Sequence, residues 1–129
     1  MRKLTVRRSI ALASTFAALA VGIAVLPNSS ASAAYACHYA WDAATGYWYA
    51  GYYSGNTVQP TASGVSTAGI EAQCLLKRYG FTPGPGTIDG VFGPKSQAAA
   101  KAFQQGVNAG LVADGKIGPA SWPVLRRQP

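Results

Sequence analysis

The sequence predicts a mostly α-helical fold: a small three-helix bundle with two pseudo-repeated Asp-Gly-x-x-Gly-Pro turns, preceded by an aromatic extension that a disulfide ties on. Three observations predict it. Residues 67–125 carry apolar side chains at helical spacing, an eight-residue motif occurs twice within them, and residues 35–53 hold eight aromatic residues and one of the two cysteines. The predicted organisation is a removable leader over 1–34, an extension and linker over 35–66, and a helical domain over 67–129.

The first 34 residues have the pattern of a signal peptide. Four cations precede an uncharged, Ala-rich stretch over residues 10–26, and small residues fill positions 29–34. We predict cleavage after Ala34, which leaves 95 of the 129 residues. A permanent membrane helix is the less favoured alternative, because the stretch is short and no positive stop-transfer cluster follows it. Arg7-Arg8 leaves the choice between the Sec and the twin-arginine export routes open.

The charge of the mature chain argues against nucleic acid as a partner. Seven Lys and Arg residues would remain against four Asp and Glu, a net charge of about +3. These cations are dispersed along the chain and form no stripe that follows phosphates.

The two cysteines, Cys37 and Cys74, predict one intramolecular disulfide. Export would take both out of the reducing cytoplasm, where pairing is the default. Two cysteines and the single His38 offer too few ligands, at the wrong spacing, for a metal site. We expect no cofactor.

The aromatic segment predicts a β-hairpin. Its two runs, residues 35–41 and 47–53, flank the five residues 42–46. Alternation along the strands makes such a hairpin aromatic on both faces. An isolated two-stranded hairpin is marginal in water, so we expect the disulfide to hold it against the helical part.

The helical part predicts a first helix with Thr67 as N-cap and Gly80 at its end. Glu71 is expected in its first turn, where the helix dipole favours an acid. The predicted buried stripe comprises Ala72, Leu75, Leu76 and Tyr79.

A second helix is predicted from Pro94 to about Gln105, stopped by Gly106, and a short third helix over residues 119–125. Their predicted core residues are Ser96, Ala99, Ala100, Phe103, Trp122 and Leu125.

The most specific signal is the internal repeat. Residues 89–96 read Asp-Gly-Val-Phe-Gly-Pro-Lys-Ser, and residues 114–121 read Asp-Gly-Lys-Ile-Gly-Pro-Ala-Ser, with five of eight positions identical. In each copy Asp-Gly makes a tight turn, an apolar residue enters the core, and Gly-Pro opens a helix. The serine hydroxyls are expected to bond the turn's backbone or its aspartate.

With these motifs, residues 67–125 resemble the type 1 peptidoglycan-binding domain family, a three-helix module attached to many cell-wall hydrolases. The resemblance rests on Ala72-Gln73, Leu76, Gly80-Phe81, Ile88-Asp89-Gly90-Val91-Phe92-Gly93, Phe103-Gln104, Asp114-Gly115-Lys116-Ile117-Gly118, Ser121-Trp122 and Leu125, in this order and spacing.

Three departures from the family pattern bear on the core. Ser96 and Ser121 stand where the family usually has threonine, and Ala100 where a larger aliphatic residue is common. Pro123 falls within the predicted last helix, where proline is costly outside the first turn.

Catalytic interpretations are weak. Asp89 and Asp114 resemble the carboxylate pair of glycoside hydrolysis, but both lie in Asp-Gly turns, where aspartate commonly bonds the backbone. His38 has no motif around it, Cys74 is expected in the disulfide, and no phosphate-binding glycine loop occurs. We expect no enzymatic activity.

The sequence therefore predicts a secreted or wall-associated protein that binds peptidoglycan, through its glycan or its stem peptide, and contacts no membrane after cleavage. The alternative is a secreted interaction protein that binds or regulates a cell-wall hydrolase. The predicted ligand-binding residues are Tyr79, Phe81, Asp89, Phe92 and Asp114 around the turns, with Trp48 and Tyr52 in the aromatic segment. Two interpretations of that segment stay open: a platform that stacks on sugars, or additional cover for a small core.

Overall fold

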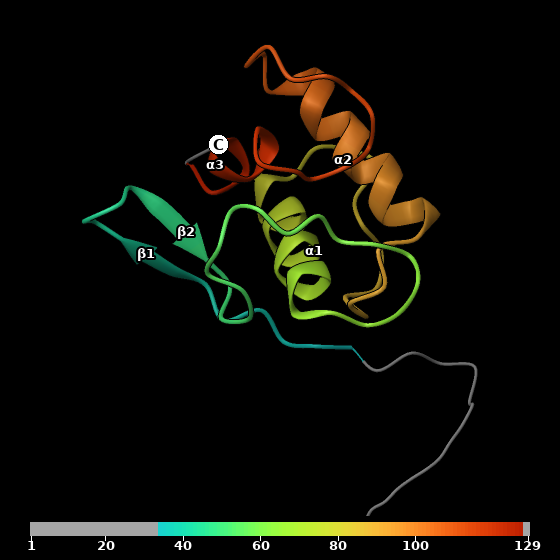
Figure 1. Ribbon diagram of the computed structural model, residues 1–129, viewed down its shortest axis with the longest axis horizontal. Coiled ribbons are helices and arrows are strands. Elements are labelled where there is room, and N and C mark those ends of the chain that lie inside the picture. The colour runs from blue at the N-terminus through green and yellow to red at the C-terminus, as the bar shows by residue number, and fades with distance from the viewer. Residues whose placement is uncertain (1–33, 128–129) are drawn as a thin grey trace, which may run out of the picture. The chain divides into compact units, whose positions relative to one another are not determined.

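The computed structural model describes residues 34–127, and in this part of the chain a two-stranded antiparallel sheet precedes three helices (Figure 1). The elements are β1 (Ala40–Asp42), β2 (Tyr47–Tyr49), α1 (Thr67–Tyr79), α2 (Pro94–Gly106) and α3 (Ser121–Leu125). The mostly helical fold and the small hairpin are confirmed. Of the predicted signal peptide, residues 1–33 lie outside the described residues.

The N-cap of α1 lies one residue earlier than predicted. Ser66, not Thr67, is the N-cap, because its extended backbone lets its Oγ accept a hydrogen bond from the Gly69 N–H at 2.9 Å. The predicted end is confirmed: Gly80 has a left-handed φ of 87°, and its N–H donates to the carbonyl of Leu76. Lys77 lies in the last turn, where a cation suits the helix dipole.

Helix α2 begins at Pro94 as predicted and ends at Gly106, one residue later than predicted. Proline suits this first position because its φ is helical and its missing N–H would have no partner there. The N-cap, Gly93, offers no side-chain oxygen to the helix.

Helix α3 begins at Ser121, two residues after the predicted start at 119. Pro123 is therefore its third residue and lies in the first turn, where no intrahelical N–H bond is lost. This position explains why a five-residue helix tolerates the proline.

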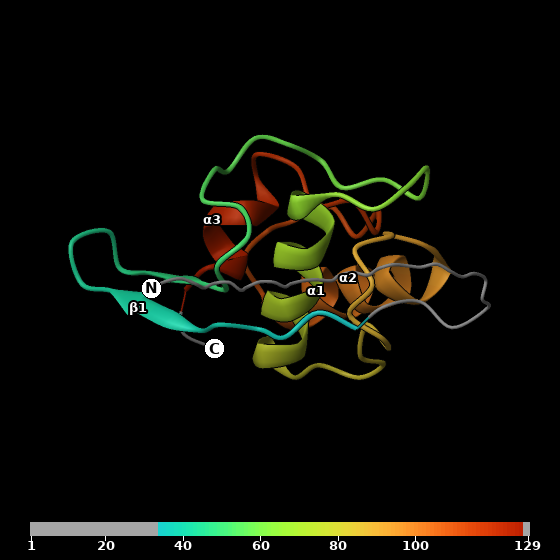
Figure 2. The same cartoon turned by 90° about the horizontal axis from the view of Figure 1, so that it is seen from below.

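The core lies between α1 and the two later helices, as both ribbon views show (Figures 1 and 2). Its members include Phe92 and Ile117 from the repeat turns and the predicted apolar residues of the three helices except Tyr79, while the predicted Ser96 is buried but polar. Tyr79, the last residue of the predicted stripe, is partly buried and packs against this cluster. Burial of these side chains from three helices and two turns is the main force that holds the module together.

The extension belongs to the same compact unit as the helices. The predicted bond between Cys37 and Cys74 is present, with the Cα atoms 5.7 Å apart, and it joins the segment before β1 to α1. The strands are three residues each and therefore shorter than the predicted runs, and Trp41 pairs with Trp48 across them. In both ribbon views the hairpin projects on the α3 side of α1, away from α2 (Figures 1 and 2).

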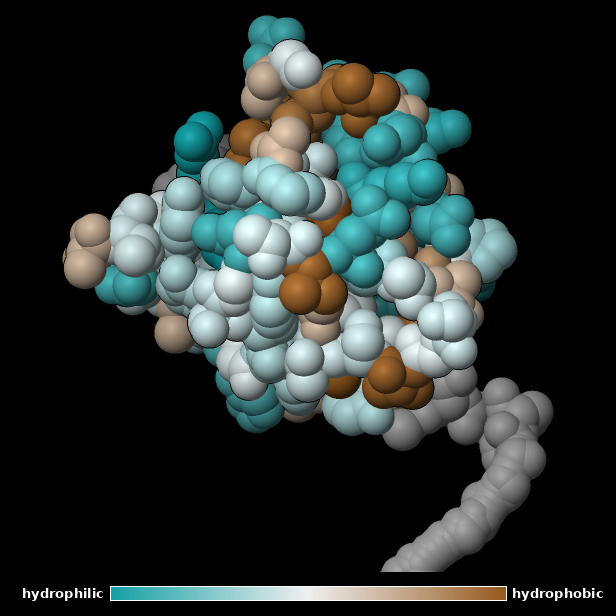
Figure 3. Space-filling view, viewed as in Figure 1, coloured by the Kyte–Doolittle hydropathy of each residue, from teal (hydrophilic) through white to brown (hydrophobic). Residues whose placement is uncertain are grey.

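The surface in Figure 3 shows small, separate hydrophobic patches among polar residues. Within residues 34–127 no helix is long and apolar enough to span a lipid bilayer.

Candidate functional site

The first repeat turn is held by Gln73, which reaches it from α1. The Gln73 Nε2 donates to Oδ1 of Asp89 at 3.0 Å, to the Val91 carbonyl at 3.0 Å and to Oγ of Ser96 at 2.8 Å. Its Oε1 accepts from the Gly90 N–H at 2.8 Å. Gly90 has a φ of 79°, and a Cβ there would approach side-chain atoms of neighbouring residues to less than 3 Å, so the turn requires glycine.

The second repeat turn is held in the same way by Gln104 of α2. Its Nε2 donates to Oδ1 of Asp114 at 3.2 Å, to the Lys116 carbonyl at 2.8 Å and to Oγ of Ser121 at 3.2 Å, and its Oε1 accepts from the Gly115 N–H at 2.9 Å. The serines thus accept from a glutamine, whereas the sequence predicted contacts with the turn's own backbone or aspartate. Each repeat consists of a turn and one glutamine from the preceding helix.

The two aspartates are occupied by these turns. Oδ1 of Asp89 accepts from the Val91 N–H at 3.0 Å, and Oδ1 of Asp114 accepts from the Lys116 N–H at 2.9 Å. The Lys116 backbone bond, helped by the Gln104 side chain, lowers the pKa of Asp114 below its ordinary value of 3.8. A carboxyl held in its charged form is a poor proton donor, which disfavours Asp114 as a general acid.

Each repeat turn borders a surface groove. The first groove, of about 370 Å³, is lined by Asp89, Ser96 and Lys95 among others. The second, of about 280 Å³, is lined by Asp114 and Lys116 among others. Each groove therefore offers a carboxylate, a serine and one lysine, although the lysines come from different positions of the repeat.

A third groove, of about 540 Å³, runs along the outer face of α2, where Gln97, Lys101 and Gln105 line it. Asp114 contributes to its wall as well as to that of the second repeat groove. The predicted residue Asp114 thus lies where two surface grooves meet.

The predicted residues Tyr79 and Phe81 lie together. Their rings stack with centroids 5.7 Å apart, and Tyr79 also meets Phe103 edge-on at 5.0 Å. Both are half-buried against the core. Phe92 is different: it is 1% exposed, so its position does not fit the predicted role at a ligand surface. The reason is the turn itself, which directs this residue inward.

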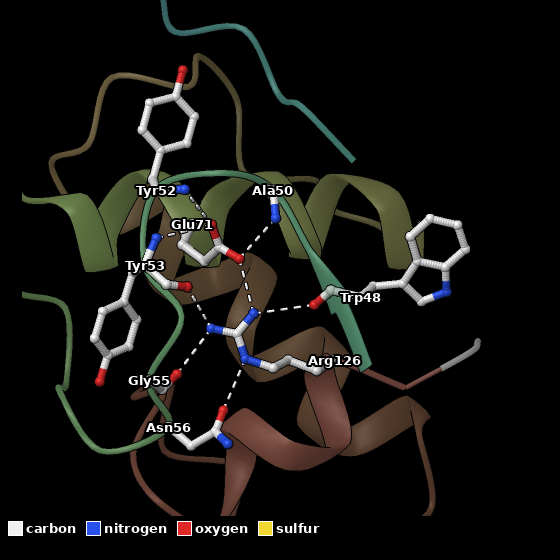
Figure 4. A network of polar contacts seen from close by, with 8 residues as sticks. All are labelled: Trp48, Ala50, Tyr52, Tyr53, Gly55, Asn56, Glu71 and Arg126. Atoms are coloured by element: carbon white, nitrogen blue, oxygen red, sulfur yellow. Dashed lines mark hydrogen bonds and ion pairs between the residues drawn. The ribbon is translucent and has the colours of Figure 1, made fainter. Parts of the chain in front are cut away.

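Trp48 and Tyr52, which were predicted to bind ligand together, do not form one platform. Figure 4 shows their side chains pointing in different directions. The Tyr52 ring meets the Tyr35 ring edge-on, with centroids 6.0 Å apart, and its centroid lies 6.1 Å from that of the His38 ring. The Trp48 ring instead lies beside the Trp41 ring, with the ring centroids 5.5 Å apart.

His38 is exposed and lies beside Tyr52. Among residues 34–127 no group of three or more His, Cys, Asp or Glu side chains is placed to hold a metal ion.

A buried ion pair joins α1 to the end of α3, and further hydrogen bonds of the same two side chains hold the extension. Oε2 of Glu71 lies 2.8 Å from Nη1 of Arg126, and neither side chain has exposed surface. The Glu71 carboxylate also accepts from the backbone N–H groups of Ala50, Tyr52 and Tyr53. Glu71 therefore does not act through the helix dipole in the first turn, as predicted, but fixes the chain that follows β2 (Figure 4).

The Arg126 guanidinium completes this network. It donates to the carbonyls of Trp48, Tyr53 and Gly55 and to Oδ1 of Asn56. Nothing in the sequence distinguished Arg126 from the other dispersed cations. The sequence held one signal for this ion pair. Glu71 lies four residues before the predicted core residue Leu75 and hence on the same, buried face of α1, where a carboxylate needs a cationic partner.

Together these features define a small helical module with two similar turns, each bordering a groove with a carboxylate, a hydroxyl and a cation. Residues 66–125 match the model of a family described as a putative peptidoglycan binding domain. Residues 66–125 therefore form a domain of this peptidoglycan-binding family, as the sequence motifs predicted.

Among solved structures, the chain is similar to a peptidoglycan-binding protein from Clostridioides difficile, determined in complex with glutamine hydroxamate. The TM-score is 0.54 and the sequence identity 27%. The similarity covers 69% of this chain but only 56% of that chain, so this chain corresponds to little more than half of that protein. No curated protein sequence matches this chain.

Proposed function

We propose that this protein binds cell-wall peptidoglycan through the two repeat-turn grooves of its helical domain. The observation that carries the proposal is the family match over residues 66–125, which contains both turns and the glutamines that hold them. The Clostridioides difficile structure supports it, since that protein is described as peptidoglycan-binding. Each groove pairs an aspartate with a lysine, and this pairing suits a ligand with amide, hydroxyl and carboxylate groups.

The domain organisation we propose follows the sequence analysis: a signal peptide over 1–34, an extension over 35–66 and the binding domain over 67–129. The bond between Cys37 and Cys74 supports export, because disulfides persist in oxidising compartments. Amino-terminal sequencing of the protein from culture supernatant tests this. We expect Tyr35 as the first residue, and a secreted product that retains Met1 would contradict the proposal.

We also propose that the protein is not an enzyme. Asp89 and Asp114 each bond the backbone of their own turn and line different repeat grooves. Purified protein added to a suspension of sacculi should leave its turbidity unchanged over hours. A fall in turbidity without any added hydrolase would contradict this.

Sedimentation with bare sacculi tests the binding site. Lys95→Ala and Lys116→Ala each remove the cation of one groove, and each should reduce the fraction of protein that sediments. Lys77→Ala is the matched control, because this exposed lysine on α1 removes the same charge but lines neither groove. Equal losses in all three variants would indicate general charge attraction and contradict the groove assignment.

A further inference from the structure

The extension that precedes the family domain is a rigid part of the molecule. Its ties to α1 include the bond between Cys37 and Cys74 and the hydrogen bond from the Tyr39 hydroxyl to the Cys74 carbonyl at 2.6 Å. Glu71 and Arg126 hold the chain that follows β2. The hairpin therefore projects from a fixed base, and a surface on it is organised before any ligand arrives.

One face of this hairpin is aromatic and open to solvent. Tyr39 and Trp41 lie two residues apart on the same side of the chain, and their exposed fractions are 39% and 43%. Trp48 pairs with Trp41 across the strands, with the ring centroids 5.5 Å apart. A small domain that leaves two large aromatic side chains exposed on a rigid hairpin has the character of a binding surface.

The same face carries positive charge. The Arg78 guanidinium lies 3.9 Å from the centre of the Trp48 ring. Burial raises the pKa of Tyr39, but the charge of Arg78 opposes this rise. Arg78 thus lies against Trp48 and near Tyr39. Asp42, the acid of this hairpin, is turned back on its own loop through bonds to Ala44 and Thr45.

We propose that the face formed by Tyr39, Trp41, Trp48 and Arg78 is a second binding surface for the peptidoglycan glycan strand, separate from the repeat-turn grooves. The Trp41 ring stacks on the apolar face of a sugar ring, and Arg78 meets a carboxylate of a stem peptide attached to the same strand. Peptidoglycan combines these two chemistries in one polymer, which is why we choose it over a neutral polysaccharide. This inference rests on the proposed function and names the part of the ligand bound here.

Tryptophan indole signals in two-dimensional NMR test the contact directly. The probe is a set of soluble glycan fragments, with their carboxylates, released from sacculi by a muramidase. The indole N–H signal of Trp41, whose side chain is exposed, should shift during the titration. Trp122 is an internal reference, because it has no exposed surface and its Nε1 donates to the Val58 carbonyl at 2.8 Å. Shifts confined to residues of the grooves would overturn the inference.

A substitution series measures the contribution of the face to binding. Trp41→Ala should weaken sedimentation with sacculi about tenfold, as expected for loss of one aromatic stacking contact, and Trp41→Phe should retain most of the affinity. Tyr47→Ala is the matched control, since Tyr47 lies beside Trp48 on the opposite face of β2. Trp41→Ala with unchanged binding, or Tyr47→Ala with an equal loss, would overturn the inference.

Two further arms separate this inference from its alternatives. If the wild-type protein failed to bind sacculi, the proposed function itself would be contradicted. If the wild-type and Trp41→Ala proteins bound equally well, only the second binding surface would be contradicted. Chitotetraose offers sugar rings without carboxylates and should bind more weakly than the muramidase fragments. Equal affinity for the two probes would contradict the role of Arg78. If the Trp41→Ala variant lost binding to a wall hydrolase but kept its binding to sacculi, the face would bind a protein partner, and the assignment to glycan would be overturned.

Discussion

Glu71 and Arg126 form their 2.8 Å ion pair where neither side chain has exposed surface. Charges in such a place are tolerated only when their remaining hydrogen-bonding positions are filled. Here the carboxylate accepts from three backbone N–H groups, and the guanidinium donates to four oxygen atoms besides the carboxylate. The pair therefore positions the end of β2 and the chain that follows it.

Replacing Glu71 should be costly. Glu71→Gln leaves Arg126 buried without its counter-charge and points an amide at backbone N–H donors, so we expect a loss of about 3 kcal/mol in the free energy of unfolding. Urea denaturation measures it. In the double variant Glu71→Gln with Arg126→Met, the loss should be smaller than the sum of the two single losses, because the partners act as a pair. Additive losses would contradict the network.

The two glutamines make the same four contacts and should have similar energetic weight. Gln73→Leu and Gln104→Leu each leave a buried glycine N–H and several acceptors without a partner, so each should destabilise the fold by about 2 to 3 kcal/mol. Thermal and urea unfolding measure the effect. Gln105→Leu is the control, because this neighbour of Gln104 is exposed and should change stability by less than about 0.5 kcal/mol. A Gln105→Leu loss as large as that of Gln104→Leu would contradict the account.

Asp114 predicts a pH dependence. Its pKa in the folded protein is lowered, chiefly because the Lys116 N–H donates to the carboxylate. The charged form therefore stabilises the fold above the ordinary carboxyl pKa of 3.8, and this contribution is lost as the pH falls through the lower, folded-state pKa. Asp114→Asn should have a lower Tm than wild type near neutral pH, and the difference should narrow in acid. A difference that stays constant down to about pH 2 would contradict this assignment.

At the scale of elements, periodicity and cap residues predicted α1 and α2 to within a residue or two. Pro94 and Gly80 mark positions where proline and glycine have local conformational reasons. The sequence did not identify the N-cap of α1, because Ser66 and Thr67 both carry a suitable hydroxyl and only the backbone conformation distinguishes them. The hairpin strands were predicted too long, because the chain after Ala50 bonds to Glu71 and Arg126, whereas the His38 N–H still bonds the Ala50 carbonyl across the hairpin.

The disulfide predicts the behaviour of the extension. The bridge closes a loop over 37 positions, and its removal should cost up to about 4 kcal/mol in the free energy of unfolding. After reduction, residues 34–39 should become the first site of protease cleavage, while Glu71 and Arg126 keep the chain after β2 in place. Limited proteolysis with mass spectrometry locates the first cut. A first cut within residues 50–56 would contradict this order of release.

At the scale of the whole molecule, the sequence predicted the family and the fold better than the site. The repeat was visible because its turn residues are local, but Gln73 and Gln104 are separated from their aspartates by 16 and 10 positions, an unequal spacing that conceals the second half of the repeat. The grouping of Trp48 with Tyr52 failed for a similar reason. Which aromatic residues share a face depends on where the strand ends, and β2 ends at Tyr49, before Tyr52.

Binding to bare sacculi, measured over a series of salt concentrations, tests the central claim most directly. The mature chain, residues 35–129, is sedimented with sacculi stripped of protein and of other wall polymers. We predict saturable binding that weakens only modestly between about 0.05 M and 0.5 M salt, because the net charge of about +3 is small and dispersed. No sedimentation at low salt, or complete loss of binding at moderate salt, would contradict recognition of peptidoglycan by this protein.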